Sequence, residues 1–177
     1  MSTSRFFVPS IVNLRDKNKL FLLCLSNGNA DGLGREREKE LEKSCRFLKF
    51  ADAPTIIDDP DLQDGMDAKW GPDLVAEQIN KYLTAKLREG PEHKINIIIT
   101  FDEYGVSYHP NHRAVNSGVS KVMSDHQFDL ELFTLQTVNV LRKYSSYFDI
   151  TLCQEWEYHL FHWNIGDTWN ALSLHSS

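Results

Sequence analysis

The sequence predicts an α/β fold in which a mostly parallel sheet is covered by helices. Two continuous apolar runs, residues 20–25 and 95–100, have the composition of strands that are buried on both faces. Each run ends in a polar loop that contains glycine, and amphipathic helical patterns separate the runs. Strands that alternate with helices favour parallel pairing, because each crossover helix returns the chain to the same edge of the sheet.

Length and composition predict one soluble domain. The chain has 177 residues, of which 41% are hydrophobic and 25% charged, as in ordinary globular proteins large enough to bury a core. Its formal net charge of -6 argues against a general nucleic-acid-binding role, because phosphate contacts favour a basic face. No nucleic-acid partner is therefore expected, and the sequence does not indicate an oligomeric state.

The first half of the chain predicts two strands and two helices. Apolar residues between positions 6 and 14 predict a short helix that ends before a charged stretch. The apolar run 20–25 predicts a buried strand, and residues 35–50 then place apolar side chains on one helical face. The pair of isoleucines at 56–57 predicts a short strand before an acidic loop.

The second half continues the alternation. A helix begins near Pro72, which suits a first helical turn, and ends at a Gly-Pro pair. The strand 95–100 follows, then a helix marked by residues 114–122, and then an alternating segment at 128–132 that predicts a further strand. After the first helix the order is therefore β-α-β-α-β-α-β, as a mostly parallel sheet requires.

The cysteines and the hydropathy pattern predict a soluble chain in a reducing compartment. Cys24, Cys45 and Cys153 are an odd number without Cys-x-x-Cys spacing, which favours neither a disulfide framework nor a thiolate zinc site. No apolar run approaches the roughly 20 residues that span a bilayer. The N-terminus also lacks the basic-then-apolar order of a signal peptide.

The loop after the second apolar run carries the strongest chemical signal. Asp102 ends that run, and His109 and His112 follow where a helical pattern begins. Histidines three residues apart face one side of a first helical turn, where neutral imidazoles bind a metal, move a proton or stabilise an oxyanion. Asp102 is placed to orient one imidazole through its far nitrogen. Two histidines alone are too few for a catalytic zinc, which normally takes three protein ligands.

Each polar loop also has a plainer interpretation. An isolated His-x-x-His more often marks a helix start, with proline in the first turn and a polar side chain as cap. The loop 28–34 leads into a helix N-terminus that could receive an anion, but it matches no phosphate-binding motif and by itself favours a flexible turn. The acidic run 58–64 lacks the spacing of a calcium loop and favours a solvated turn.

Taken together, several segments resemble the PIG-L/LmbE-like zinc deacetylases, and most closely the eukaryotic N-acetylglucosaminyl-phosphatidylinositol de-N-acetylases. The matching segments cover roughly residues 5–150 in a constant order, which is more specific than any one motif. They are Arg5 to Ile11, Leu23 to Gly34 with Arg37 and Glu40-Leu41, Leu62 to Met66 with Trp70, Thr100 to Asp102 with Gly105 to Ser107, His109-x-Asn111-His112, and Leu141 to Tyr144.

The resemblance implies a Rossmann-like sheet with helices on both faces and removal of the acetyl group from the glucosamine of a phosphatidylinositol glycolipid. This is a step of glycosylphosphatidylinositol anchor biosynthesis at the cytoplasmic face of the endoplasmic reticulum, so the glycolipid and that membrane surface are the implied partners. By the match, His112 is a zinc ligand and His109 stabilises or protonates the tetrahedral intermediate. Arg37 and Asp102 are the implied substrate-binding residues. Zinc would polarise the amide carbonyl and lower the pKa of bound water to about 7.

One departure from the family pattern bears on activity. Family members carry a His-Pro-Asp-Asp motif after a first strand, just ahead of the segment that resembles Arg5 to Ile11. The histidine and one aspartate of that motif bind zinc, and the other aspartate is the general base. The first strand and this motif are missing here, so two of the usual zinc ligands are absent. Residues 1–150 are expected to be an N-terminally truncated domain of this family, and residues 151–177 a divergent tail.

Three hypotheses follow for this chain. The first is a de-N-acetylase that is weakly active or inactive as it stands. The second is a non-catalytic glycolipid-binding or regulatory protein that keeps the substrate cleft of the family. The third is a chain too unstable to have a role of its own, which would show no core protected from hydrogen exchange.

Overall fold

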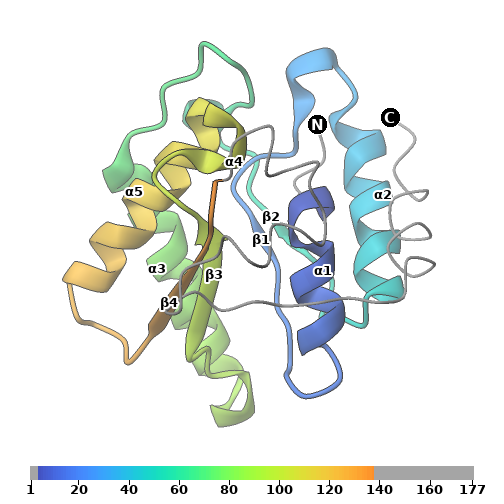
Figure 1. The fold of residues 1–177 in the computed structure, drawn as a ribbon, viewed down its shortest axis with the longest axis vertical. Coiled ribbons are helices and arrows are strands. Elements are labelled where there is room, and N and C mark those ends of the chain that lie inside the picture. The colour runs from blue at the N-terminus through green and yellow to red at the C-terminus, as the bar shows by residue number, and fades with distance from the viewer. Residues whose placement is uncertain (1–3, 138–177) are drawn as a thin grey trace, which may run out of the picture.

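The structure is a computed structural model that describes residues 4–137 (Figure 1). The predicted tail 151–177 and the segment Leu141 to Tyr144 lie outside these residues. The helices are α1 (Ser4–Leu14), α2 (Gly34–Phe47), α3 (Pro72–Glu89), α4 (Gly105–Tyr108) and α5 (Pro110–Ser124). The strands are β1 (Leu23–Cys24), β2 (Thr55–Ile56), β3 (Ile97–Phe101) and β4 (Glu131–Leu135). Short 3-10 helices cover Asn29–Asp31, Pro60–Leu62 and Pro91–His93.

All four strands pair in parallel, as the alternation of strands and helices predicts. β1 pairs with β2 in the register Leu23 to Thr55, and β3 pairs with β4 in the register Ile97 to Glu131. Among the described residues these are two two-stranded sheets rather than one continuous sheet. Leu23 and Ile98 nevertheless pack against the same core, so the two sheets belong to one layer (Figure 1).

Helices cover this layer on two sides, which confirms the predicted mixed α/β architecture. On one side α3 and α5 contribute most of a buried cluster, whose innermost side chains are Leu62, Val75 and Val122. On the other side α1 packs on the end of α2 through Val8, Val12 and Leu48, and its Phe7 ring lies 5.1 Å from the ring of Phe101 in β3. No helix within residues 4–137 is both long and apolar enough to cross a membrane.

α3 packs extensively against α5. Gly118 of α5 is buried, and a Cβ built there would lie 2.2 Å from Cγ1 and 2.6 Å from Cβ of Val75 in α3. Real carbon atoms do not approach so closely, because repulsion rises steeply inside van der Waals contact. Glycine at this position therefore sets the distance between the two helices.

Several element boundaries differ from the predictions. The apolar run 20–25 is paired in a ladder only at β1, although Leu25 is buried, because an apolar run reports burial while a strand also needs a hydrogen-bonded neighbour. The alternating segment 128–132 becomes a strand only from Glu131, and Phe128 and Leu130 pack against the core ahead of it. α5 already begins at Pro110, directly after His109.

An ion-pair cluster lies at the end of the sheet where the strands begin. Lys86 is buried, with 7% of the residue exposed, and its ammonium donates to the Asp52 carboxylate at 2.6 Å and to the Glu89 carboxylate at 2.9 Å. It also lies 5.9 Å from the centre of the Tyr82 ring. Burial raises the pKa of Tyr82 to about 12, and the bonds from Asp52 and Glu89 outweigh burial and raise the pKa of Lys86.

These shifts predict a loss of stability in alkali. Between about pH 10 and about pH 12 the folded chain keeps the Tyr82 proton that the unfolded chain has lost, so the free energy of unfolding falls as the pH rises through that window. Lys86 acts in the same direction, because its raised pKa also favours the protonated folded form. Urea titrations from pH 8 to pH 12 should show a fall that is shallower in Tyr82→Phe. An identical pH profile for this variant would contradict the assignment.

The two described cysteines are inert thiols. Cys24 and Cys45 are free, and burial raises the pKa of each to about 12. Because the thiolate is the reactive form, a raised pKa leaves both thiols protonated at neutral pH when no metal is bound. Cys153 lies outside the described residues.

Candidate functional site

The loops that follow β1, β2 and β3 meet at the edge of the sheet where these strands end, which is the upper edge in Figure 1. In parallel α/β folds ligands gather at this edge, because loops there hold polar groups above a rigid sheet. The sequence places His109, His112 and Arg37 in or beside these loops. The structure brings them to the same region.

The two histidines lie side by side at the start of α5. His109 is the N-cap residue, and its Nδ1 accepts a hydrogen bond from the backbone amide of Asn111 at 3.3 Å. His112 is in the first turn, and the two ring centres are 4.9 Å apart. The His-Pro-Asn-His segment is therefore a capped helix start and a pair of neighbouring imidazoles at once, so the two interpretations of the sequence do not exclude each other.

His112 is held in one orientation by packing and by a hydrogen bond. Its ring stacks on Phe101 with centres 3.9 Å apart, and Phe6 of α1 meets it edge-on at 6.1 Å. Its Nδ1 lies 3.0 Å from the carbonyl oxygen of Gly105. A carbonyl only accepts, so Nδ1 carries the proton and Nε2 keeps a free lone pair, which is the arrangement of a histidine that binds a metal.

The electrostatic surroundings keep His112 neutral. Burial lowers the pKa of His112, and the neighbouring His109 lowers it further, while the bond to the Gly105 carbonyl and the negative charge of Asp64 act in the opposite direction. The balance is a pKa below the ordinary value of histidine. A neutral imidazole is the form that can donate its lone pair to a metal.

Asp102 fixes the loop that presents the Gly105 carbonyl. Its buried carboxylate accepts from the backbone amides of Tyr104 at 3.1 Å and Gly105 at 2.8 Å, and from both the amide and the hydroxyl of Thr137. The orienting role expected of Asp102 is therefore indirect, because the carboxylate holds Gly105 and Gly105 holds His112. A direct contact of Asp102 with substrate stays a prediction.

Arg37 reaches the same edge from α2. Its guanidinium donates to the carbonyl of Gly28 and to the Asp31 carboxylate, the second at 2.7 Å, and 18% of its side chain is exposed. A Cβ built on Gly28 would lie 3.5 Å from Nη1 of Arg37 and 4.0 Å from Oδ2 of Asp64. Arg37 and Asp64 therefore flank the same loop, and Arg37 gives this acidic region a positive charge.

Asn111 and Asp64 also belong to the site, and neither was predicted as a site residue. The Asn111 side chain, 3% exposed, donates to Oδ1 of Asp64 at 2.9 Å, and its own Oδ1 has no hydrogen-bond partner within residues 4–137. The Oδ1 of Asn27, in the loop after β1, is also buried and has no hydrogen-bond partner within residues 4–137. The position of Asn111 between the two histidines was the available signal, whereas Asp64 looked like one carboxylate of a solvated acidic loop.

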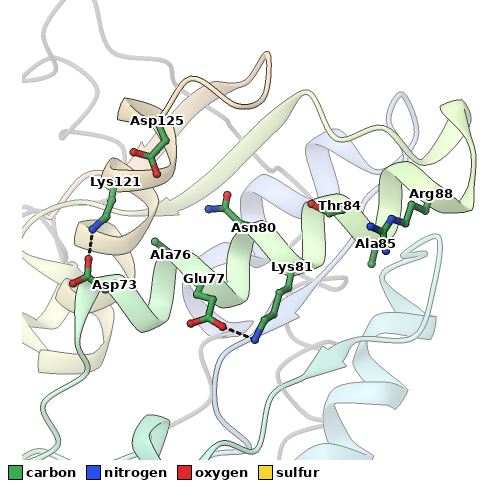
Figure 2. Close-up of a pocket in the computed structure, with 10 residues that line it drawn as sticks. All are labelled: Asp73, Ala76, Glu77, Asn80, Lys81, Thr84, Ala85, Arg88, Lys121 and Asp125. Atoms are coloured by element: carbon green, nitrogen blue, oxygen red, sulfur yellow. Dashed lines mark hydrogen bonds and ion pairs between the residues drawn. The ribbon is translucent and has the colours of Figure 1, made fainter.

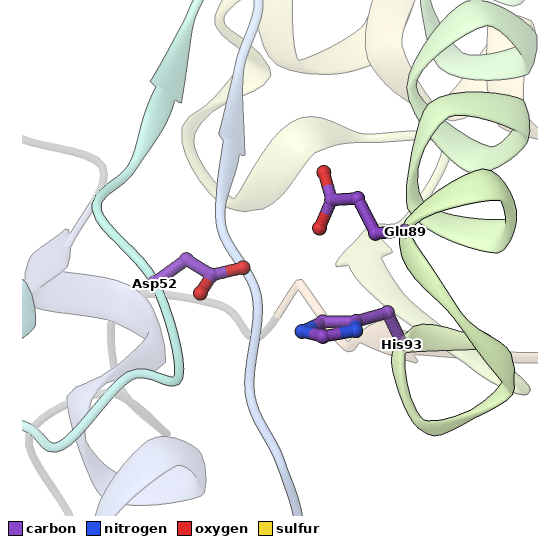
Figure 3. A group of neighbouring side chains, drawn as sticks. All are labelled: Asp52, Glu89 and His93. Carbon is purple, nitrogen blue, oxygen red and sulfur yellow. The ribbon is translucent and has the colours of Figure 1, made fainter.

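Residues 4–137 do not supply a complete set of metal ligands at the candidate site. The group of three potential donors within this range is Asp52, Glu89 and His93 (Figure 3). These residues precede β2 and β3, whereas His112 follows β3, so the group lies at the other end of these strands. The ammonium of Lys86 already bonds both carboxylates of that group, so the place of a cation is taken. His112 and His109 supply at most two donors, fewer than the three of a catalytic zinc.

A surface groove lies apart from this site. A groove of about 520 Å³ runs between α3 and α5 (Figure 2). Its charges are largely paired, since Lys81 bonds Glu77 at 2.6 Å and Lys121 bonds Asp73. Because its lining includes neither histidine, we do not assign the candidate site to it.

Comparison with known proteins decides the family. The sequence model of the PIG-L family, described as GlcNAc-PI de-N-acetylase, matches residues 4–123. The chain belongs to the PIG-L family. No solved structure shows a significant match.

Three relatives of the PIG-L chain illustrate the similarity. A probable N-acetylglucosaminyl-phosphatidylinositol de-N-acetylase of Schizosaccharomyces pombe is 41% identical over 149 residues, 82% of this chain and 57% of the relative. The de-N-acetylase of the same name from Bos taurus is 38% identical over 82% of this chain and 56% of its own length. A probable one from Dictyostelium discoideum is 31% identical over 83% of this chain and 66% of its own length. The chain thus spans a little over half of the first two relatives.

Proposed function

We propose that this chain acts on N-acetylglucosaminyl-phosphatidylinositol as a PIG-L de-N-acetylase, in glycosylphosphatidylinositol anchor biosynthesis. The observation that carries the proposal is the fixed His109 and His112 pair, at the edge of the sheet where ligands gather, in a chain 41% identical to a relative of that name. The reaction hydrolyses the amide between the acetyl group and the glucosamine nitrogen, and releases acetate and a free amine.

The proposal gives each residue of the site a task. His109 is the N-cap residue of α5, and its Nδ1 makes the capping hydrogen bond. Its Nε2 can therefore exchange a proton with the tetrahedral intermediate. Arg37, beside the loop after β1, is positioned to attract the phosphate of the glycolipid. Asn111 donates a hydrogen bond to Asp64 and so fixes this carboxylate near His109 and Arg37.

Zinc is the proposed cofactor, with His112 as one ligand. When bound, zinc polarises the acetyl carbonyl and lowers the pKa of a bound water. The donors within residues 4–137 do not complete its coordination, so stable binding needs ligands beyond those that the structure describes. The place of action that this function implies is the endoplasmic reticulum membrane, at its cytoplasmic face.

A second candidate function is a non-catalytic glycolipid-binding or regulatory role. The observation that favours it is the incomplete metal site: Arg37 and the two histidines are in place, but among the described residues the histidines do not form a group of three closely spaced donors. Such a protein would bind the glycolipid and release no acetate.

Acetate release separates the two functions. Purified chain with N-acetylglucosaminyl-phosphatidylinositol in detergent micelles and added zinc should release acetate, and His112→Ala should lower the rate about a hundredfold or more, as loss of a metal ligand does. The matched control is Leu87→Ser on α3, half exposed and remote from the histidines, which should keep the wild-type rate. Glycolipid binding without acetate would favour the non-catalytic role, and neither binding nor turnover would contradict both.

A further inference from the structure

The most exposed large apolar side chains of the described residues gather around the candidate site. Met66 is 69% exposed, Tyr108 66% and Tyr104 50%, more than any other large hydrophobic residue within residues 4–137. Met66 is two residues from Asp64, which bonds the first turn of α5, and the two tyrosines flank α4 just ahead of His109. We call these three side chains the rim.

The loop that carries the two tyrosines of the rim is fixed by its own backbone. Val106 and Tyr108 have φ angles of 62° and 59°, values that β-branched and bulky residues rarely adopt. The loop is secured in this shape, because the Val106 amide donates to Thr137 Oγ1 at 2.9 Å and the Tyr108 amide to the Tyr104 carbonyl at 2.9 Å. The two tyrosine rings face each other edge-on with centres 6.0 Å apart. Non-glycine residues in such conformations cluster where a segment serves a function.

The substrate class explains why apolar side chains would surround this site. The proposed substrate is a phosphatidylinositol glycolipid whose acyl chains stay in a bilayer, so the mouth of the site has to reach the membrane surface. Tyrosine and methionine suit that position, because tyrosine has an apolar ring with a polar tip and both bury apolar surface among lipid headgroups.

The charges beside the rim indicate which lipid surface fits. The loop 58–71 that carries Met66 contains five aspartates and one lysine, and residues 102–108 add Glu103 and the buried Asp102. Two arginines reach the same region, since Arg113 donates to the Glu103 carbonyl and Arg37 to the Gly28 carbonyl, so acidic residues still outnumber basic ones. An anionic membrane attracts basic segments and repels acidic ones. The rim therefore fits a zwitterionic phospholipid surface, with burial of apolar side chains as the attraction.

We propose that Met66, Tyr104 and Tyr108 form a membrane-docking rim that sets the mouth of the site onto a zwitterionic phospholipid bilayer. The proposal rests on the proposed function, which supplies the reason for docking at this edge. It adds the surface and the type of lipid that the chain recognises before any headgroup enters the site.

Co-sedimentation with phosphatidylcholine vesicles tests the rim without substrate. The full chain should partition onto these vesicles, and the triple variant Met66→Ser, Tyr104→Ser, Tyr108→Asn should lose about tenfold or more in partitioning, since each change removes buried apolar area. Asparagine is chosen at position 108 because it tolerates the left-handed backbone. The control Leu87→Ser, similarly exposed at 49% but on α3, should partition like the wild type. Equal far-UV circular dichroism and unfolding midpoints would show that the variants are folded.

Three outcomes would contradict the proposed membrane-docking role of the rim. They are no partitioning of the wild type onto the vesicles, equally strong partitioning of the triple variant, or binding that requires anionic lipid and disappears with salt. Vesicles that also contain N-acetylglucosaminyl-phosphatidylinositol distinguish this failure from a failure of the proposed function. Loss of partitioning in the triple variant, with no gain from this glycolipid over plain phosphatidylinositol, would support the rim and contradict the function. A gain from the glycolipid without an effect of the triple variant would do the reverse.

Discussion

Replacing Gly118 with alanine should destabilise the chain by about 3 kcal/mol. The new Cβ would lie 2.2 Å from Cγ1 of Val75, within the contact between α3 and α5, so these helices would have to separate. Alanine is the better helix former, but that gain is at most about 1 kcal/mol and does not offset the overpacking. Urea unfolding followed by circular dichroism would measure the difference.

A matched set of variants isolates the contact between Gly118 and Val75. Ser117→Ala, on the exposed side of the same helix, should change stability by no more than about 0.5 kcal/mol. Val75→Ala makes room at the contact, so the double variant with Gly118→Ala should cost less than the sum of the two single changes. If Gly118→Ala were as mild as Ser117→Ala, the packing of α3 on α5 would be different from that described here.

Asp102→Ala should cost about 3 kcal/mol and release His112 from its orientation. The change removes the acceptor of three backbone amides and one hydroxyl, and each partly buried donor left without a partner costs about 1 kcal/mol or more. The Gly105 carbonyl would then no longer be fixed opposite Nδ1 of His112. Asp102→Asn keeps one acceptor oxygen and should lose about half as much stability.

Imidazole nitrogen chemical shifts would report the effect on His112. In the wild type the shifts should show one tautomer, with the proton on Nδ1, and in Asp102→Ala a mixture of both tautomers. A purely structural role of Asp102 would lower stability and leave the tautomer of His112 unchanged, so that result would contradict the chain of contacts from Asp102 through Gly105.

Much of the fold could be predicted from local patterns, because burial and helical periodicity are local properties. The apolar run 95–100 became β3, and Pro72 and the Gly-Pro pair after Glu89 bound α3 as expected. The pairing of strands is not a local property, because each strand needs a partner from a distant segment. In the apolar run 20–25 only Leu23 and Cys24 have ladder partners, which come from Thr55 and Ile56. The expectation that the first strand of the family is missing stays a prediction, because no described residue tests it.

In the site, too, local features could be predicted from the sequence and contacts between distant residues could not. His109 and His112 were found because their spacing within one helix turn is visible in the sequence. The Asp64 to Asn111 bond joins residues 47 positions apart, and only the packing of the loops reveals it. α4 was not predicted either, because the left-handed backbone of Val106 and Tyr108 contradicts the preference of both residue types.

Equilibrium binding of the glycolipid headgroup is the most direct test of the account. In micelles, the chain should bind N-acetylglucosaminyl-phosphatidylinositol saturably and more tightly than phosphatidylinositol, and Arg37→Ala should weaken binding of both lipids about tenfold, as loss of a charge-assisted phosphate contact does. This result would support a glycolipid site at the carboxyl edge of the sheet, whether or not acetate is released. Equal binding of both lipids by the wild-type chain would contradict it.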